Sequence, residues 1–214
     1  MKLIPSGREN IQAVPRAYIG MLPNHGRGNQ GVDISALLYS TIAEIGKEKI
    51  QSEIALDIKQ SKYYIELIIN NCKKRIDNVD EDTVGSLCES LLHFMLTISI
   101  LPSIRKVAFN GTVLDIVIPS LRVLKNSPEN SVVILISKGS ENIIQEKISH
   151  IKRFQPNEKN LWIVSEKPLP LPCVNYSLNQ NEIFSEEKNN YSNLIIDIDK
   201  FLHEKGDKSL KIFQ

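Results

Sequence analysis

The chain has 214 residues, of which 42% are hydrophobic and 24% are charged, and its formal net charge is +1. This composition excludes a fibrous or wholly disordered protein. The small net charge excludes a polycation, so any contact with nucleic acid must come from a local basic patch. The three cysteines are far apart, which argues against a disulfide framework or a zinc site and favours a reducing compartment. We therefore expect a cytoplasmic protein, and the longest apolar stretch, Leu91–Leu101, is too short to cross a membrane.

The first part of the chain predicts an irregular arm followed by helices. Residues 1–31 are rich in Gly, Pro and Asn, which indicates an arm without regular structure. Apolar residues then recur at helical spacing over Val32–Ile45, which predicts a first helix. Residues 32–76 are expected to form a helical domain that resembles a helix-turn-helix.

The segment Gln51–Asn71 carries the helix-turn-helix pattern found in many DNA-binding proteins. Its first helix contains the pair Ile54-Ala55, whose small alanine would let the two helices approach. Its second helix carries Ile65 and Ile68 on one face. Lys59 stands at the turn position that usually holds Gly, where a positive φ would cost about 1 kcal/mol.

The outer surface of this segment is the predicted DNA-binding surface. Side chains there would donate to phosphates or reach base edges if the second helix entered the major groove. The candidate DNA-binding residues are Lys59, Ser61, Lys62, Tyr63, Glu66, Asn70, Lys73 and Lys74. The same arrangement of helices also serves as plain packing, and the pattern leaves that alternative open.

An acidic, turn-prone segment over residues 77–82 marks the boundary to a second predicted domain, residues 83–214. This domain begins with an amphipathic helix over Thr83–Ile98. Asn110-Gly111 then predicts a two-residue hairpin turn between strands at Ile104–Phe109 and Thr112–Ile118.

The following pattern predicts a strand, a helix and a parallel strand. Ser131–Ser137 is a continuous apolar run, typical of a central strand buried on both faces. Ser140 begins a helix whose apolar positions are Ile143, Ile144, Ile148, Ile151 and Phe154, and Pro156 ends it. Leu161–Ser165 is the next strand. The expected fold class is therefore α/β, with a mixed β-sheet flanked by helices, and Tyr191–Leu202 is either a further edge strand or a closing helix.

This order of helix, hairpin, strand, helix and strand resembles the core of the PD-(D/E)XK nucleases, a restriction-endonuclease-like fold, and most of all the archaeal Holliday junction resolvases. The motifs that carry the resemblance are Gly85-Ser86-Leu87-Cys88-Glu89, Leu114-Asp115-Ile116-Val117 and Ile136-Ser137-Lys138. The resemblance implies catalytic roles for Glu89, Asp115 and Lys138. It makes the two carboxylates ligands of a magnesium ion, and the lysine helps to organise the attacking water.

Ile136 departs from the family's pattern, because it stands where the family has a metal-binding acid. An isoleucine cannot ligate a metal, so another acid, such as Glu141 at the start of the next helix, would have to replace it. We therefore expect a degenerate site that needs no cofactor, or a magnesium site if the protein is an active enzyme.

Three functions are compatible with these patterns. The one we favour is a non-catalytic DNA-binding protein, whose helix-turn-helix docks on double-stranded or branched DNA while the nuclease-like domain adds backbone contacts or forms a homodimer. The second is a magnesium-dependent DNA endonuclease that resembles a Holliday junction resolvase. The third is a protein-interaction or scaffold subunit. Ile136 distinguishes the first from the second, and salt-dependent DNA binding distinguishes the first from the third.

Overall fold

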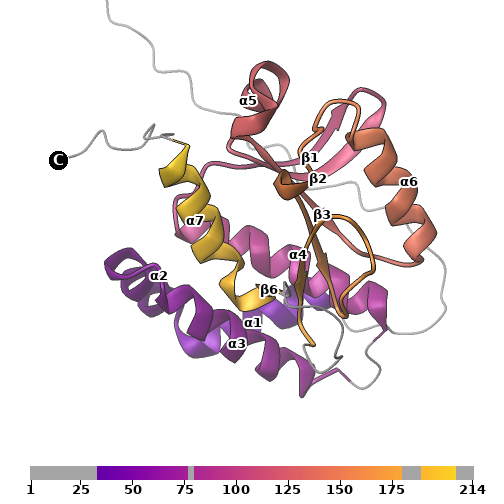
Figure 1. Ribbon diagram of the computed structural model, residues 1–214. Helices are drawn as coiled ribbons and strands as arrows, with labels where there is room; N and C mark the ends of the chain where they lie inside the picture. The colour runs from indigo at the N-terminus through magenta and orange to yellow at the C-terminus, as the bar shows by residue number, and fades with distance from the viewer. Residues whose placement is uncertain (1–32, 77–79, 180–188, 206–214) are drawn as a thin grey trace, which may run out of the picture. The chain divides into compact units, whose positions relative to one another are not determined.

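The computed structural model describes residues 33–76, 80–179 and 189–205. In this part of the chain, a mixed sheet of six strands is covered by helices on both faces (Figure 1). The predicted N-terminal arm, residues 1–31, lies outside the described residues, as does part of the predicted boundary segment. No helix in the described ranges combines the length and the apolar character that a membrane crossing requires.

The helical segment contains helices where the sequence predicts them. It consists of α1 (Ile34–Ile45), α2 (Lys47–Leu56) and α3 (Gln60–Lys73). Asp33 caps α1, because its side chain accepts hydrogen bonds from two backbone amides of the first turn. Gly46, with φ of 100°, then allows the chain to turn directly into α2.

The hairpin is also as predicted. Helix α4 (Glu81–Ile98) is capped by Asp80 and leads to β1 (Ile104–Phe109) and β2 (Thr112–Ile118). Between the strands, Asn110 and Gly111 have φ of 47° and 77°. Two consecutive positive φ angles are the requirement of a type I′ turn, and they fix the register in which Phe109 faces Thr112.

The rest of the described chain completes the sheet and its cover. It contains α5 (Leu121–Asn126), β3 (Val132–Ile136), α6 (Glu141–Ile151), β4 (Leu161–Ser165), β5 (Val174–Ser177), β6 (Asn189–Asn190) and α7 (Leu194–Glu204), with short 3-10 helices at Pro128–Asn130, Glu158–Asn160 and Tyr191–Asn193. The strands follow the order β1-β2-β3-β4-β5-β6, antiparallel up to β3 and parallel from β3 onwards. The predicted mixed sheet with β3 at its centre is confirmed, and the open alternative for 191–202 resolves to a helix.

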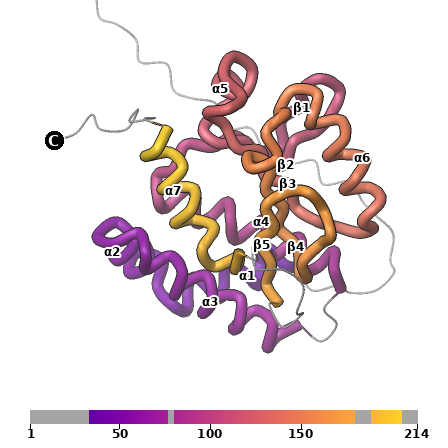
Figure 2. Tube along the Cα trace, viewed as in Figure 1, coloured from indigo at the N-terminus to yellow at the C-terminus, as the bar shows by residue number. Residues whose placement is uncertain are grey.

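Strand β3 contributes to two hydrophobic cores, one on each face of the sheet. Ile134 and Ile136 belong to the core that includes residues of α1 to α4 and α7, whereas Val133 and Leu135 belong to the core that includes residues of α5 and α6. Figure 2 shows α6 on one side of the strands and α4 and α7 on the other. The helical segment 33–76 and the sheet therefore share one continuous core. Ile143 does not belong to either core. It was expected on the apolar face of α6 but is 59% exposed, since successive helical residues are rotated by about 100° and Ile144 takes the buried position.

Candidate functional site

The candidate site lies where strands β2 and β3 separate. Their pairing ends at Ile116 and Ile134. Asp115 precedes Ile116 on β2, and its side chain replaces the next backbone contact between the strands. Its Oδ2 accepts a hydrogen bond of 3.0 Å from the backbone amide of Ile136. Asp115 is 5% exposed. The Asp115 carboxylate therefore lies between β2 and β3 at the point where their backbone pairing stops.

Lys106 lies opposite Asp115 on β1, because the hairpin register pairs the residues on either side of them. Its φ is 46°, in the left-handed region, which costs a residue with a Cβ atom about 1–2 kcal/mol. The Nζ atom lies 2.9 Å from Glu89 Oε1 and 3.1 Å from Asp115 Oδ1. A strained residue that bridges two buried carboxylates is typical of a functional site.

Glu89 reaches the same place from α4, and it too is 5% exposed. Its Oε2 accepts a hydrogen bond of 2.6 Å from Lys138 Nζ, just beyond the end of β3. Gly85, one turn before Glu89, allows α4 to pack closely against the end of β3. A Cβ atom at Gly85 would lie 2.5 Å from the carbonyl oxygen of Ser137, which is well inside the contact limit.

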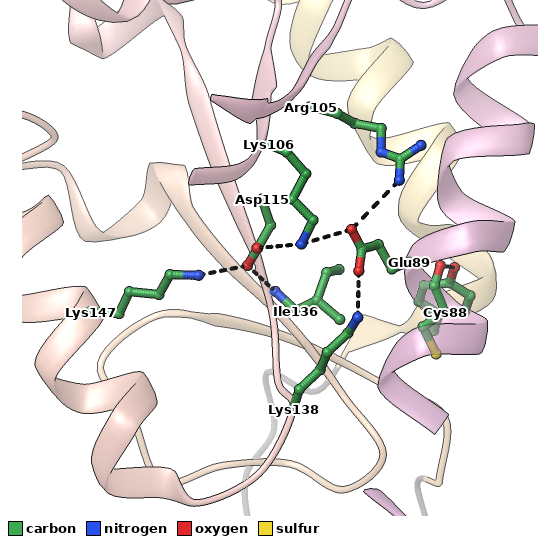
Figure 3. A network of polar contacts seen from close by, with 9 residues as sticks. Cys88, Glu89, Arg105, Lys106, Asp115, Ile136, Lys138 and Lys147 are labelled. Atoms are coloured by element: carbon green, nitrogen blue, oxygen red, sulfur yellow. Dashed lines mark hydrogen bonds and ion pairs between the residues drawn. The ribbon is translucent and has the colours of Figure 1, made fainter. Parts of the chain in front are cut away.

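Two further bases complete the site. Arg105 Nη2 lies 3.7 Å from Glu89 Oε1, and Lys147 Nζ, from α6, lies 3.1 Å from Asp115 Oδ2. Figure 3 shows these side chains converging from α4, β1, β2, α6 and the end of β3. We call this group the charged cluster; its members are Glu89, Arg105, Lys106, Asp115, Lys138 and Lys147.

The charged cluster is positive. Its four basic and two acidic side chains give a formal charge of +2. Burial alone would raise the pKa of the Glu89 carboxyl, but its bonds with Lys138 and Lys106 outweigh burial and the pKa is lowered. Likewise burial lowers the pKa of Lys106, and the two carboxylates more than reverse this, so the pKa is raised. Both groups are therefore charged near neutral pH.

The magnesium site implied by the nuclease resemblance does not fit this arrangement. Lys106 already occupies the space between Glu89 and Asp115. A magnesium ion needs about six oxygen ligands at about 2.0–2.1 Å, and a net positive surrounding repels it. Among the described residues, no group of three or more His, Cys, Asp or Glu side chains is placed to hold a metal.

The acid missing at Ile136 is not supplied by α6. Glu141 accepts a hydrogen bond of 2.9 Å from Gln145 on its own helix. The α6 side chain that reaches Asp115 is instead Lys147, a base. The structure thus brings together the three predicted residues Glu89, Asp115 and Lys138, but it surrounds them with cations.

The helix-turn-helix prediction needs three corrections. Ser61 was expected on the outer surface, yet its exposed fraction is 0%. The reason is helical spacing, since Ser61 precedes Ile65 by four and Ile68 by seven residues and so shares their buried face. Lys59 has φ of −63°, so the expected cost of a positive φ does not arise. Ala55 is exposed and does not mediate the approach of α2 and α3.

The other predicted DNA-binding residues lie at or near the surface. Glu66 is already engaged, because it accepts a hydrogen bond of 2.8 Å from Ser192 Oγ, which ties α3 to the segment before α7. Tyr63 is 56% exposed. Lys73 is half-buried, and the exposed members of the set are Lys59, Lys62, Tyr63, Glu66, Asn70 and Lys74.

Sequence reasoning missed Arg105, Lys106 and Lys147. For Lys106 the signal was present, because a two-residue turn at Asn110-Gly111 fixes the register that places it opposite Asp115. Lys147 is separated from Asp115 by 32 residues, and no local pattern indicates their contact.

The fold has counterparts among solved structures. No protein-family model and no curated protein matches the chain. It is similar to metal-depleted Ecl18kI in complex with uncleaved, modified DNA (13% identity, TM-score 0.58, covering 86% of this chain and 82% of that one). It is also similar to the restriction endonuclease PspGI in a complex with substrate DNA (13% identity, TM-score 0.54, covering 80% and 93%). The chain therefore has a restriction-endonuclease-like fold.

Proposed function

We propose that this protein binds DNA and holds a backbone phosphate at the charged cluster without hydrolysing it efficiently. The observation that carries this proposal is the composition of the cluster: two buried carboxylates in nuclease-like positions, with Lys138, Lys147 and two further bases around them. The side chains of these bases are partly exposed and can contact a phosphate, while Ile136 stands where the nuclease pattern has a metal-binding acid.

The structural relatives support DNA as the ligand. Ecl18kI has been seen, metal-depleted, in a complex with uncleaved DNA. In that protein DNA is thus held without metal, and we infer the same for this chain. The ligand is double-stranded or branched DNA, and α3 is a second contact surface through Lys62 and Tyr63, which are exposed. A homodimer would let two copies contact the two strands.

A salt titration tests the proposal. Binding of a labelled duplex and of a four-way junction is measured over a range of salt concentrations. We expect a steep loss of affinity with salt, because contacts with phosphates release counterions. Lys147→Ala should reduce the slope of log affinity against log salt by about one unit.

The matched control is Lys152→Ala, at the end of the same helix, whose ammonium pairs with Glu158 outside the cluster. It should leave the slope unchanged. Absence of DNA binding by the unmodified protein would reject the proposal and favour a protein-interaction subunit.

A magnesium-dependent endonuclease is the second candidate, because Glu89, Asp115 and Lys138 do converge. It requires the metal to displace Lys106 from between the carboxylates.

A further inference from the structure

Lys106 has a position that no other base of the charged cluster shares. In the part of the chain that the structure describes, its ammonium contacts both buried carboxylates, whereas Arg105 and Lys138 contact Glu89 and Lys147 contacts Asp115 (Figure 3). It therefore lies between the two acids that the nuclease resemblance makes metal ligands.

The backbone holds Lys106 there. Its φ of 46° is unfavourable for a residue with a side chain. As a result, two consecutive residues of β1, Arg105 and Lys106, both reach Glu89, although neighbouring side chains of a regular strand point to opposite faces. The strand is thus distorted at the residue that bridges the acids.

We propose that the Lys106 ammonium takes the place of a divalent cation between Glu89 and Asp115. The charge of Lys106, together with those of Lys138 and Lys147 on the outer carboxylate oxygens, more than neutralises the two acids. The two carboxylates then do not repel a DNA phosphate, and no metal is needed for binding. The DNA part of this inference rests on the proposed function, while the metal part stands without it.

The first experiment measures metal binding alone, by calorimetric titration of the full chain with Mn²⁺. The test variant is Lys106→Gly, which removes the ammonium and suits a positive φ. We expect it to bind Mn²⁺ about tenfold or more tightly than the unmodified protein, because the two carboxylates become free. Lys147→Ala also removes one positive charge but leaves Lys106 in place. It is the control, and its affinity for Mn²⁺ should not rise comparably.

The second experiment measures DNA affinity in EDTA and in Mg²⁺. The unmodified protein should bind equally in both. Lys106→Gly should bind more weakly in EDTA and recover in Mg²⁺.

Three results would overturn the inference. One is stoichiometric Mn²⁺ binding by the unmodified protein that Asp115→Asn removes. Another is loss of its DNA binding in EDTA. The third is a folded Lys106→Gly, checked by circular dichroism, with no gain in metal binding; Lys106→Met repeats this test if the glycine variant does not fold. If the unmodified protein does not bind DNA at all, the proposed function fails while the Mn²⁺ titration still decides the role of Lys106.

Discussion

At the scale of single residues, the ion pairs of Glu89 in the charged cluster should make the stability of the protein depend on pH. Its pKa lies below the ordinary value of 4.5 because the bonds with Lys138 and Lys106 outweigh burial. A carboxyl whose pKa is lower in the folded state stabilises the protein above its unfolded pKa, and this contribution is lost as pH falls through the folded pKa.

The corresponding prediction compares the unmodified protein with Glu89→Gln. The difference in unfolding free energy, from urea titrations between about pH 7 and about pH 3, should be large at the upper end and shrink at the lower end, where the protonated acid resembles the amide. A difference that stays constant across this range would mean that the ion pairs of Glu89 do not stabilise the fold.

Ile136 gives a second prediction at this scale. Asp115, Glu89 and Lys138 surround it in Figure 3, so Ile136→Glu would place a third carboxylate beside them. We expect Ile136→Glu alone to gain little magnesium-dependent DNA cleavage, because Lys106 still lies between Glu89 and Asp115. The double variant with Lys106→Gly should raise it, since a missing electrostatic stabiliser commonly costs about 100-fold in rate. If both variants are merely unstable, by several kcal/mol from an unpaired buried acid, the cluster does not have the geometry of a nuclease site.

At the scale of elements, the contact between α4 and the end of β3 depends on Gly85. A Cβ atom there would lie 2.5 Å from Ser137 O and 2.8 Å from Lys138 Cγ. Gly85→Ala must therefore push α4 away and move Glu89 from Lys138. We expect a loss of about 1–3 kcal/mol in stability together with weaker DNA binding, measured by denaturation and fluorescence anisotropy.

Ser86→Ala, on the next residue of α4, is the control and should change neither quantity by a comparable amount. Normal stability and binding of Gly85→Ala would show that the close approach does not position the site.

Helix α3 is the proposed second DNA-contact surface, and its exposed side chains can be tested by substitution. Replacing Lys62 and Tyr63 with alanine should weaken duplex binding and lower the salt slope by about one unit, because both side chains are exposed and the lysine would contact a phosphate. The matched pair is Lys47→Ala with Tyr39→Ala, an exposed lysine and an exposed tyrosine elsewhere in the helical segment. Unchanged affinity of the α3 variant, or an equal loss in the matched pair, would leave α3 with a packing role alone.

Some of these elements could be predicted from the sequence, and others could not. The hairpin was predictable because Asn-Gly favours a turn with two positive φ angles, and β3 because a continuous apolar run suits a strand buried on both faces. Helix α5 and strands β5 and β6 are short, and tertiary pairing rather than local pattern determines them. Within the site, Glu89, Asp115 and Lys138 were predictable from their order along the fold, whereas Lys147 depends on how α6 packs on the sheet.

At the scale of the whole molecule, a small net charge coexists with a local positive site. The chain as a whole carries +1, while the charged cluster alone carries four bases against two acids. Affinity for DNA is therefore expected from local surfaces, the charged cluster and α3, and not from general attraction, which should limit non-specific binding at physiological salt.

The measurement that tests the central claim most directly follows binding and cleavage in the same samples. The full chain is incubated with labelled duplex and four-way junction DNA in Mg²⁺, in Mn²⁺ and in EDTA, at protein concentrations above the dissociation constant. We predict equal bound fractions in all three conditions and no cleavage above background. Robust metal-dependent cleavage by the unmodified protein, abolished by Asp115→Ala, would contradict the account and identify an active endonuclease.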